Sequence, residues 1–268
     1  MYPLSLNEPA LAEITRQLKN FIQGSVRSAR AKGAVVALSG GVDSSVVAAL
    51  AHDVVDTKTL ILPETAVTSA QDVLDATSIA EVYGLPFTVI EINDLIDCFK
   101  EAARPILPVR MNGGQVSIAE ANLKPRIRMT LSYVTSNADL RLVLGTGNKT
   151  ELLMGYFTKY GDGGVDALPI GRLYKTQVFQ LARYVGIPDR IIAKAPSAGL
   201  WLGQTDEEEL GLSYDVLDRI LLELIDKEKT VKETAKLLDV EPKRVQEISD
   251  QVHRAKHKRH TPLLPTIT

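Results

Sequence analysis

The feature that most constrains the fold is the stretch VVALSGGVDSSVVAAL at residues 35–50. Residues 35–38 form a continuous apolar run rich in valine, which suits a strand buried on both faces. Residues 46–51 are rich in alanine and valine and suit a buried helix. The polar residues between them therefore form a strand-to-helix turn. Its two glycines let the backbone approach a ligand closely, and the helix start offers unpaired N–H groups. The stretch predicts an anion site, with phosphate as the expected ligand.

Strands and helices alternate along most of the 268-residue chain. Apolar runs predict strands at 35–38, 59–62 and 86–92 and at the start of 140–151. Periodic patterns predict helices at about 8–31, from 43, and at 69–84, 94–103, 122–138 and 174–186, followed by a helical block at about 206–258. The alternation predicts an α/β fold in which a doubly wound, mainly parallel sheet carries helices on both faces, as one domain over residues 1–268.

Two glycine turns, at residues 39–44 and 145–149, each follow a predicted strand. In doubly wound sheets, ligands bind beyond the carboxyl ends of the strands. We therefore expect both turns to face one crevice. The Pro/Gly-rich segment at 104–117 and residues 198–207 are expected to be lid-like and to become ordered with ligand.

Composition narrows the class of protein. The net charge of −2 gives no bulk attraction to nucleic acid or anionic lipid. No segment stays apolar for the roughly 18 residues that a membrane helix needs, and the first residues do not resemble a signal peptide. The single cysteine, Cys98, excludes an intrachain disulfide, and we expect it to be buried in a helix. These features predict a cytoplasmic protein with no nucleic-acid or membrane partner.

The turn SGGVDSS lacks the lysine and the spacing of a Walker A loop. It resembles the S-G-G-x-D-S loop of the N-type ATP pyrophosphatases. This resemblance implies a loop that holds the β- and γ-phosphates of ATP, in an adenine nucleotide alpha hydrolase-like fold. A carboxylate does not attract phosphate, so Asp43 indicates a bridging Mg²⁺. The alternative is an ordinary tight turn in which Asp43 caps the helix.

Further motifs narrow the resemblance to the NAD synthetases. They are NLKPRIRM, GTGNKTELLMGYFTKYGDGGVD, LYKTQV, KAPSAGLW and the late HKR, which come in the order and spacing of that family from about residue 10 to about 262. The resemblance implies that ATP, deamido-NAD and ammonia give NAD, AMP and pyrophosphate through an adenylated intermediate. It also implies a homodimer with deamido-NAD bound partly at the interface.

Each site residue is carried over from its matching motif position. For ATP the resemblance implies Ala37, Leu38, Ser39, Gly40, Gly41, Val42, Asp43, Ser44, Thr146, Lys175 and Ser197. For deamido-NAD it implies Arg126, Lys159, Asp166, His257 and Lys258, and for Mg²⁺ it implies Asp43 and Glu151. Asp43, Lys175 and Asp162 are the expected catalytic residues, with Asp162 placing ammonia. Two positions depart from the family pattern, namely Pro125, where alanine is common, and Ser197, where threonine is common.

Two other interpretations remain open at this stage. The segment at 230–259 matches a helix-turn-helix DNA reader with a basic end, which would make the chain an ATP-sensing regulator. The acidic TDEEELG at 205–211 argues against it, and a basic end also suits a polyanionic dinucleotide. The chain could instead be another adenylating amidotransferase or a thiolating enzyme, although thiolation usually needs catalytic cysteines. We expect free ammonia rather than glutamine as the nitrogen donor, because the synthetase motifs occupy almost all of these residues.

Overall fold

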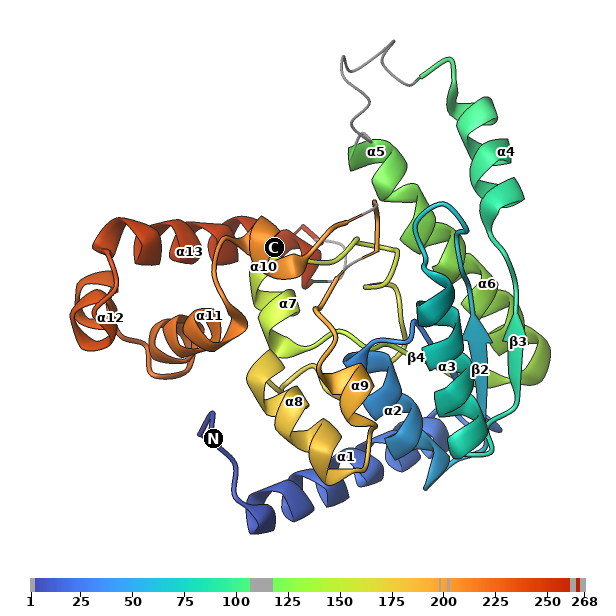
Figure 1. Ribbon diagram of the computed structural model, residues 1–268, viewed down its shortest axis with the longest axis horizontal. Helices are drawn as coiled ribbons and strands as arrows, with labels where there is room; N and C mark the ends of the chain where they lie inside the picture. Colours follow the sequence, from blue (N-terminus) through green and yellow to red (C-terminus); the bar gives the residue numbers. More distant parts are fainter. Residues whose placement is uncertain (1–2, 107–117, 198, 202, 261–263, 266–268) are drawn as a thin grey trace.

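The computed structural model describes residues 3–106, 118–197, 199–201, 203–260 and 264–265. Its centre is a parallel sheet with the strand order β3-β2-β1-β4 (Figure 1). The strands are β1 (Gly33–Ala37), β2 (Thr57–Ile61), β3 (Phe87–Val89) and β4 (Arg141–Leu144). The order reverses between β1 and β4, so a ligand site is expected beyond the carboxyl ends of these two strands.

Helices cover both faces of the sheet. The first-face helices are α1 (Glu8–Ser28), α2 (Val42–His52), α3 (Ala70–Val82), α8 (Lys175–Tyr184) and α9 (Asp189–Ile192). The opposite face is covered by α4 (Asn93–Ala103) and α6 (Leu123–Asp139), with the short α5 (Ile118–Ala121) leading into α6. Consecutive residues of β1 point to opposite faces, so Val35 packs with α4 and α6 while Val36 packs with α2 and α8. This arrangement confirms the predicted α/β fold.

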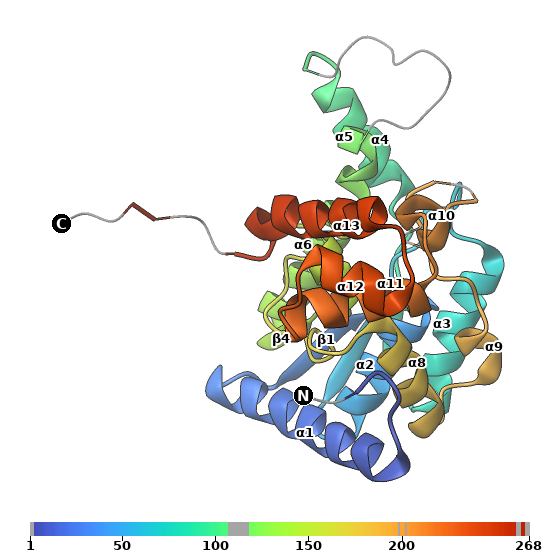
Figure 2. The same ribbon diagram turned by 90° about the vertical axis from the view of Figure 1, so that its left-hand side faces the viewer.

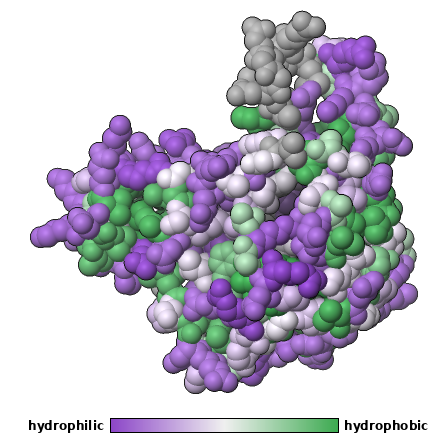
Figure 3. All heavy atoms as spheres, in the orientation of Figure 1, coloured by the Kyte–Doolittle hydropathy of each residue, from purple (hydrophilic) through white to green (hydrophobic). Residues whose placement is uncertain are grey.

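The C-terminal block is helical, as predicted, and lies to the left of the sheet in Figure 1, on the side that faces the viewer in Figure 2. It contains α10 (Asp206–Leu210), α11 (Tyr214–Leu221), the π-helix η1 (Leu222–Asp226), α12 (Val231–Leu238), α13 (Pro242–Arg254) and the 3₁₀ helix η2 (Ala255–Lys258). Its apolar core also includes side chains from α7 (Lys149–Met154) and from the start of α8. Hydrophobic side chains gather over this block at the left of Figure 3. The helices α7 and α8 therefore join the block to the sheet.

The structure corrects three details. Cys98 is exposed rather than buried, because α4 buries only Ile96 and turns its other side chains toward solvent. The third strand ends at Val89, short of the predicted 92. The helix predicted at 122–138 begins at Leu123, with Asn122 at its N-cap, and the Asn122 side chain accepts the Thr158 hydroxyl at 2.6 Å instead of capping the helix.

None of the helices in the described part of the chain has both the length and the hydrophobicity needed to cross a bilayer. Most of the expected lid-like segment at 104–117, from residue 107 onward, lies outside the described residues, as do residues 198 and 202. The expectation that these segments become ordered with ligand stays a prediction.

Candidate active site

The turn between β1 and α2 is shaped to leave backbone amides available. Gly40 has a φ of +78°, and a Cβ at this position would lie 2.3 Å from the carbonyl oxygen of Asp72, so only glycine fits. Ser44 Oγ donates to the Gly41 carbonyl at 3.1 Å, which closes the turn. The N-cap of α2 is Gly41, and no side chain caps this helix. Asp43 is therefore not the helix cap, and the first amides of α2 remain free to bind an anion.

Three charged side chains meet where β1 and β4 end. The Lys175 ammonium forms an ion pair with Asp43 and lies 3.7 Å from Glu151 Oε1. Its side chain is only 2% exposed, against 16% for Asp43 and 18% for Glu151. Asp43 comes from the first turn of α2, Glu151 from α7, and Lys175 opens α8. The fold thus brings together three residues that are far apart in the sequence, at the crevice that the two glycine turns were predicted to face.

Asn148 links the two turns. As the N-cap of α7 its side chain accepts the Glu151 amide at 3.0 Å, and its Nδ2 donates to Asp43 Oδ1, also at 3.0 Å. Glu151 Oε2 in turn accepts the Asn148 amide at 3.0 Å, which completes a capping box. Sequence reasoning missed Asn148, although the pattern Asn-x-x-Glu at the start of a helix is a recognisable capping signal.

The close approach of these charged groups shifts the pKa values of Glu151 and Lys175. Burial and the nearby carboxylate of Asp43 raise the pKa of Glu151 to about 8, although Lys175 opposes the shift. Burial by itself lowers the pKa of Lys175, but Asp43 and Glu151 raise it above its ordinary value. A buried pair of carboxylates that needs a cation beside it is a feature of metal and phosphate sites.

Asp43 and Glu151 fit a Mg²⁺ ion. Mg²⁺ is commonly held by one or two carboxylates, while substrate phosphates and water supply its other oxygen ligands. Repulsion between the two carboxylates makes a cation at this position favourable. The described residues contain no cluster of three or more His, Cys, Asp or Glu side chains arranged for a metal. A Mg²⁺ here would therefore depend on oxygen atoms of the bound nucleotide.

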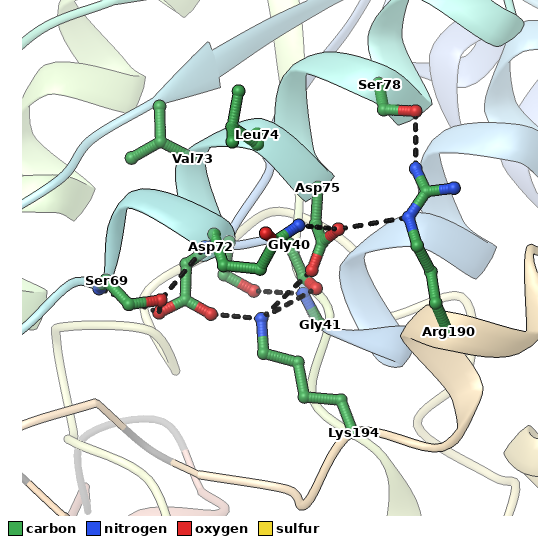
Figure 4. A network of polar contacts seen from close by, with 12 residues as sticks. Gly40, Gly41, Ser69, Asp72, Val73, Leu74, Asp75, Ser78, Arg190 and Lys194 are labelled. Atoms are coloured by element: carbon green, nitrogen blue, oxygen red, sulfur yellow. Dashed lines mark hydrogen bonds and ion pairs between the residues drawn. The ribbon is translucent and has the colours of Figure 1, made fainter.

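A second ionic network supports the back of the phosphate turn (Figure 4). Lys194 pairs with Asp72, lies 3.4 Å from Asp75 Oδ2 and is 3.5 Å from the Gly40 carbonyl oxygen. Arg190 Nε donates to Asp75 at 3.2 Å. These contacts tie α3 and α9 to the turn and line an open hollow bordered by Gln71, Asp75, Arg190, Ala193 and Lys194. Sequence reasoning did not single out this network. Lys194 opens the KAPSAGLW motif, but its acidic partners Asp72 and Asp75 come from a segment without a motif.

Four of the residues predicted for the dinucleotide lie where α6, the loop at 156–172 and η2 meet, namely Arg126, Lys159, His257 and Lys258. Arg126 of α6 contacts the Lys159 carbonyl oxygen at 3.4 Å, and Lys159 Nζ donates to the His257 carbonyl at 2.9 Å. Lys258 Nζ donates to the Gly155 and Phe157 carbonyls at 2.8 and 2.9 Å, respectively. The side chains of Arg126 and His257 are exposed, so they are available to a ligand.

Asp162 and Asp166 both hold the loop in place. Asp162 Oδ1 accepts the Thr158 amide at 2.8 Å. Asp166 accepts the Val143 amide of β4 at 2.8 Å and the Tyr133 hydroxyl at 3.0 Å, and burial together with this carboxylate raises the pKa of Tyr133. The Asp166 side chain therefore has a structural part in the fold, in addition to the binding role predicted for it.

Thr146 and Ser197 lie on loops around the phosphate turn. Thr146 is half-buried in the segment that connects β4 to α7. Ser197 is exposed, and its Oγ accepts the Gly199 amide at 3.1 Å. The Asp206 amide donates to the neighbouring Pro196 carbonyl at 3.0 Å, so α10 holds the Ser197 segment at one end.

Two residues of the basic segment, Lys258 and Arg259, are turned inward. Arg259 donates to the carbonyls of Leu152 and Leu153, the latter at 2.7 Å, and thereby caps α7. Lys258 is bound to carbonyls of the adjoining loop, as described above. A DNA-reading helix-turn-helix needs its basic side chains free for phosphates, so these contacts argue against that interpretation of residues 230–259.

Comparison with known proteins agrees with the site geometry. A family model described as NAD synthase matches residues 14–262. An NH(3)-dependent NAD(+) synthetase of Archaeoglobus fulgidus is 51% identical over 253 residues, which cover 93% of this chain and 95% of the relative.

Two solved structures share the fold over almost the full length. An NMN synthetase from Francisella tularensis superposes with a TM-score of 0.83 at 35% identity, covering 96% of this chain and 99% of the other. An NH3-dependent NAD synthetase from Campylobacter jejuni gives a TM-score of 0.78 at 27% identity and covers 98% and 100% of the two chains. With the matched motifs and the Asp43–Glu151–Lys175 cluster, these findings place the chain in the NAD synthase family.

Proposed function

We propose that this protein converts deamido-NAD and ammonia to NAD and uses ATP, which it splits into AMP and pyrophosphate. The observation that carries the proposal is the meeting of Asp43, Glu151 and Lys175 beside the uncapped start of α2. This arrangement provides amides for phosphate, two carboxylates for Mg²⁺ and one buried ammonium. The relative from Archaeoglobus fulgidus bears the name of the same activity.

The ATP side of the site is formed by the turn and its neighbours. The proposed contacts are Ala37, Leu38, Ser39, Gly40, Gly41, Val42, Asp43, Ser44, Thr146, Lys175 and Ser197. Amides and hydroxyls of the turn would bind phosphate oxygens. Asp43 and Glu151 would hold Mg²⁺, which supplies positive charge to the phosphates when bound.

The dinucleotide side is the surface of Arg126, Lys159, Asp166, His257 and Lys258. Its basic groups suit the pyrophosphate of a dinucleotide. Asp166 holds the loop at 156–172 against β4, which would keep Lys159 in register with Arg126. Asp162 lies within this loop and is the proposed residue for placing ammonia.

The reaction proceeds in two steps. A carboxylate oxygen of deamido-NAD attacks the α-phosphorus of ATP, and the bond to the β-phosphate breaks to release pyrophosphate. Ammonia then attacks the carbonyl carbon of the adenylate, loses a proton and expels AMP. Lys175, whose burial strengthens its charge interactions, stabilises the negative charge that develops on the leaving pyrophosphate.

We also propose an oligomeric state, a cellular location and a domain organisation for the enzyme. We infer a homodimer with deamido-NAD partly at the interface, because Tyr160 and Val134 expose large apolar surface beside the dinucleotide residues. A chain with a single cysteine suits the reducing cytoplasm. We also infer that residues 1–268 act as one synthetase domain.

A second candidate substrate follows from the NMN synthetase of Francisella tularensis, which superposes at 35% identity. Such an enzyme differs in amidating a mononucleotide. Deamido-NAD remains the favoured substrate, because the relative with 51% identity bears the NAD(+) synthetase name.

The test is a substrate comparison with purified protein. Deamido-NAD and nicotinic acid mononucleotide are each supplied with Mg²⁺, ATP and ammonium, and the products are separated by chromatography. We expect NAD with an equal amount of AMP, and a higher kcat/KM for deamido-NAD. A higher kcat/KM for the mononucleotide would show that the protein is an NMN synthetase instead. ADP as the main nucleotide product would contradict the proposed cleavage of ATP to AMP and pyrophosphate.

A further inference from the structure

Two aspartates of the C-terminal block are buried against the starts of α7 and α8. Asp218 of α11 is fully buried, and the side chain of Asp226, at the end of η1, is 8% exposed. The helix α11 packs against both α7 and α8 and lies to their left in Figure 1. Glu151 belongs to the first turn of α7, and Lys175 is the first residue of α8. The two aspartates therefore contact the helix starts that carry two members of the charged cluster.

Asp218 joins the two helix starts through a single carboxylate. Its Oδ1 accepts the Thr150 hydroxyl at 2.5 Å, and its Oδ2 accepts the Thr176 amide at 2.8 Å. The Thr150 oxygen also accepts the Lys175 amide at 3.0 Å. The residue before Glu151 and the backbone of Lys175 are thus fixed to one another and to α11.

Asp226 makes a similar connection, one residue before the Asp218 contact at the start of α7 and two residues before it at the start of α8. It accepts the Lys149 ammonium at 2.5 Å and the Tyr174 hydroxyl at 3.0 Å. Lys149 and Tyr174 directly precede Thr150 and Lys175. Asp226 is the last residue of a π-helical turn. Such turns are rare in proteins as a whole, but those that occur are frequently found at functional sites.

Most of these links are not needed to cap the starts of the two helices. The start of α7 has its own capping box between Asn148 and Glu151. At the start of α8 the Gln177 side chain accepts the Tyr174 amide at 2.9 Å, and Asp218 accepts the first-turn amide of Thr176. Capping therefore explains one of the contacts of Asp218. The contact of Asp218 with Thr150 and both contacts of Asp226 are not helix caps, and what they add is a connection between α7 and α8.

The surroundings of Asp218 are apolar. Its neighbours in α11, Leu217 and Leu221, belong to a hydrophobic core that includes Met154 of α7 and Tyr174. Apolar side chains of similar size often stabilise such an interface at least as well as buried charges do. The advantage of a buried carboxylate over an apolar side chain at this position is that its hydrogen bonds are directional and fix the geometry of the two helix starts.

We propose that the C-terminal helical block positions the active site, with Asp218 and Asp226 holding α7 and α8 so that Glu151 and Lys175 both reach Asp43. The two aspartates act as positioning residues, since their contacts are to neighbours of the cluster and not to the cluster carboxylates. The inference rests on the proposed function for the roles of Glu151 and Lys175. It assigns the block a purpose in ATP and Mg²⁺ binding rather than in DNA binding.

The test compares variants at both ends of the link. Asp218→Asn replaces one acceptor by a donor at constant size, and Thr150→Val removes the hydroxyl at nearly constant volume. Thr150→Ser restores the hydroxyl. Asp215→Asn is the matched control, because Asp215 lies in the same helix with a 62% exposed side chain. Binding of ATP with Mg²⁺ is measured by titration calorimetry without deamido-NAD, and folding by the melting temperature.

We expect Asp218→Asn and Thr150→Val to weaken binding of Mg²⁺-ATP by about 10- to 100-fold. The KM for deamido-NAD should change by less than about twofold, as it would for a defect confined to the ATP side. Thr150→Ser should recover most of the affinity, and Asp215→Asn should bind as the parent does. The double variant should be little worse than the more affected single variant, because both changes break the same link.

Folded Asp218→Asn and Thr150→Val proteins that bind Mg²⁺-ATP normally would overturn the inference. If Asp218→Asn does not fold, the comparison of Thr150→Val with Thr150→Ser is the deciding test. Failure of Thr150→Val to fold as well would also overturn it, because the network would then serve stability and not positioning. Calorimetry requires no turnover, so a parent protein that binds Mg²⁺-ATP but makes no NAD would contradict the proposed function and leave this inference standing.

Discussion

The side-chain amide of Asn148 donates a hydrogen bond of 3.0 Å to the carboxylate of Asp43. It joins the turn after β4 to the turn after β1, which are adjacent because β1 and β4 pair in parallel. Asn148 is completely buried and also caps α7 through the Glu151 amide. One side chain therefore fixes the spacing between the two proposed Mg²⁺ ligands.

Replacing Asn148 by alanine should affect both stability and ATP binding. Loss of an N-cap typically costs about 1 kcal/mol of unfolding free energy, and loss of the link to Asp43 should weaken Mg²⁺-ATP binding. Thr230→Ala is the matched control, because Thr230 forms a similar capping box with Glu233 in α12. Denaturant unfolding and nucleotide titration check this. We expect Asn148→Ala and Thr230→Ala to lose similar amounts of stability. Only Asn148→Ala should bind Mg²⁺-ATP more weakly than the parent. Equal nucleotide binding by both variants would refute the linking role of Asn148.

The raised pKa of Glu151 predicts how stability depends on pH. Burial and the nearby Asp43 carboxylate raise this pKa from its ordinary value of 4.5 to about 8 in the folded protein. Between these values the folded state holds a proton that the unfolded chain has lost, so the free energy of unfolding falls as pH rises through the window. Glu151→Gln should remove this component, and Glu91→Gln, at an exposed position, should retain it.

Mg²⁺ affinity should show the opposite trend, because the Glu151 carboxylate must be deprotonated to bind the metal. Melting temperatures and Mg²⁺ titrations at several pH values between about 6 and 9 measure both effects. Identical pH profiles of melting for the parent and Glu151→Gln would show that Glu151 does not titrate in this window.

Lys159→Ala should weaken deamido-NAD binding more than ATP binding. Lys159 lies on the surface shared with Arg126 and His257, away from the Asp43 cluster. Loss of one charged contact in the complex should cost about 2 kcal/mol, roughly 30-fold in Kd. Separate calorimetric titrations with each ligand measure the two effects, with the exposed Lys232→Ala as control. Equal losses for both ligands would indicate general damage to the loop.

Free ammonia should be the nitrogen donor. Releasing ammonia from glutamine requires a further site with a nucleophile, commonly cysteine, and the single cysteine is exposed on α4. Cys98→Ser should therefore retain full ammonium-dependent turnover. Since the deprotonated amine attacks, the apparent KM for total ammonium should fall as pH rises. Sustained turnover on ammonia-free glutamine by the purified chain would disprove this prediction.

Local patterns in the sequence predicted the sheet and the crevice correctly. The apolar run at 35–38 and the glycine turn after it specify a buried strand and a helix start, and the similar pattern at 140–151 repeats the design. Because parallel strands end at the same edge, the two glycine turns were expected to face one crevice, whereas the pairing of Asp43 with Glu151 came from the family motifs. The match to family motifs then brought in Lys175, which no local pattern identifies.

The supporting contacts could not be predicted, because they join segments that are distant in the sequence. Asp218 and Thr150 are 68 residues apart, and each is unremarkable within its own helix. The exposure of Cys98 depends on how much of α4 the sheet covers, which a short apolar pattern does not specify. The inward orientation of Lys258 and Arg259 likewise depends on carbonyls at the end of α7.

The central claim is that a substrate carboxylate attacks the α-phosphate of ATP at the Asp43–Glu151–Lys175 cluster. The most direct measurement uses deamido-NAD whose carboxylate oxygens carry a heavy isotope, followed by mass spectrometry of the nucleotide products. Adenylation leaves the bridging oxygen on the phosphate when ammonia expels AMP, so we predict one heavy oxygen in AMP and none in pyrophosphate. Unlabelled AMP, or heavy oxygen in a phosphate released together with ADP, would contradict the account.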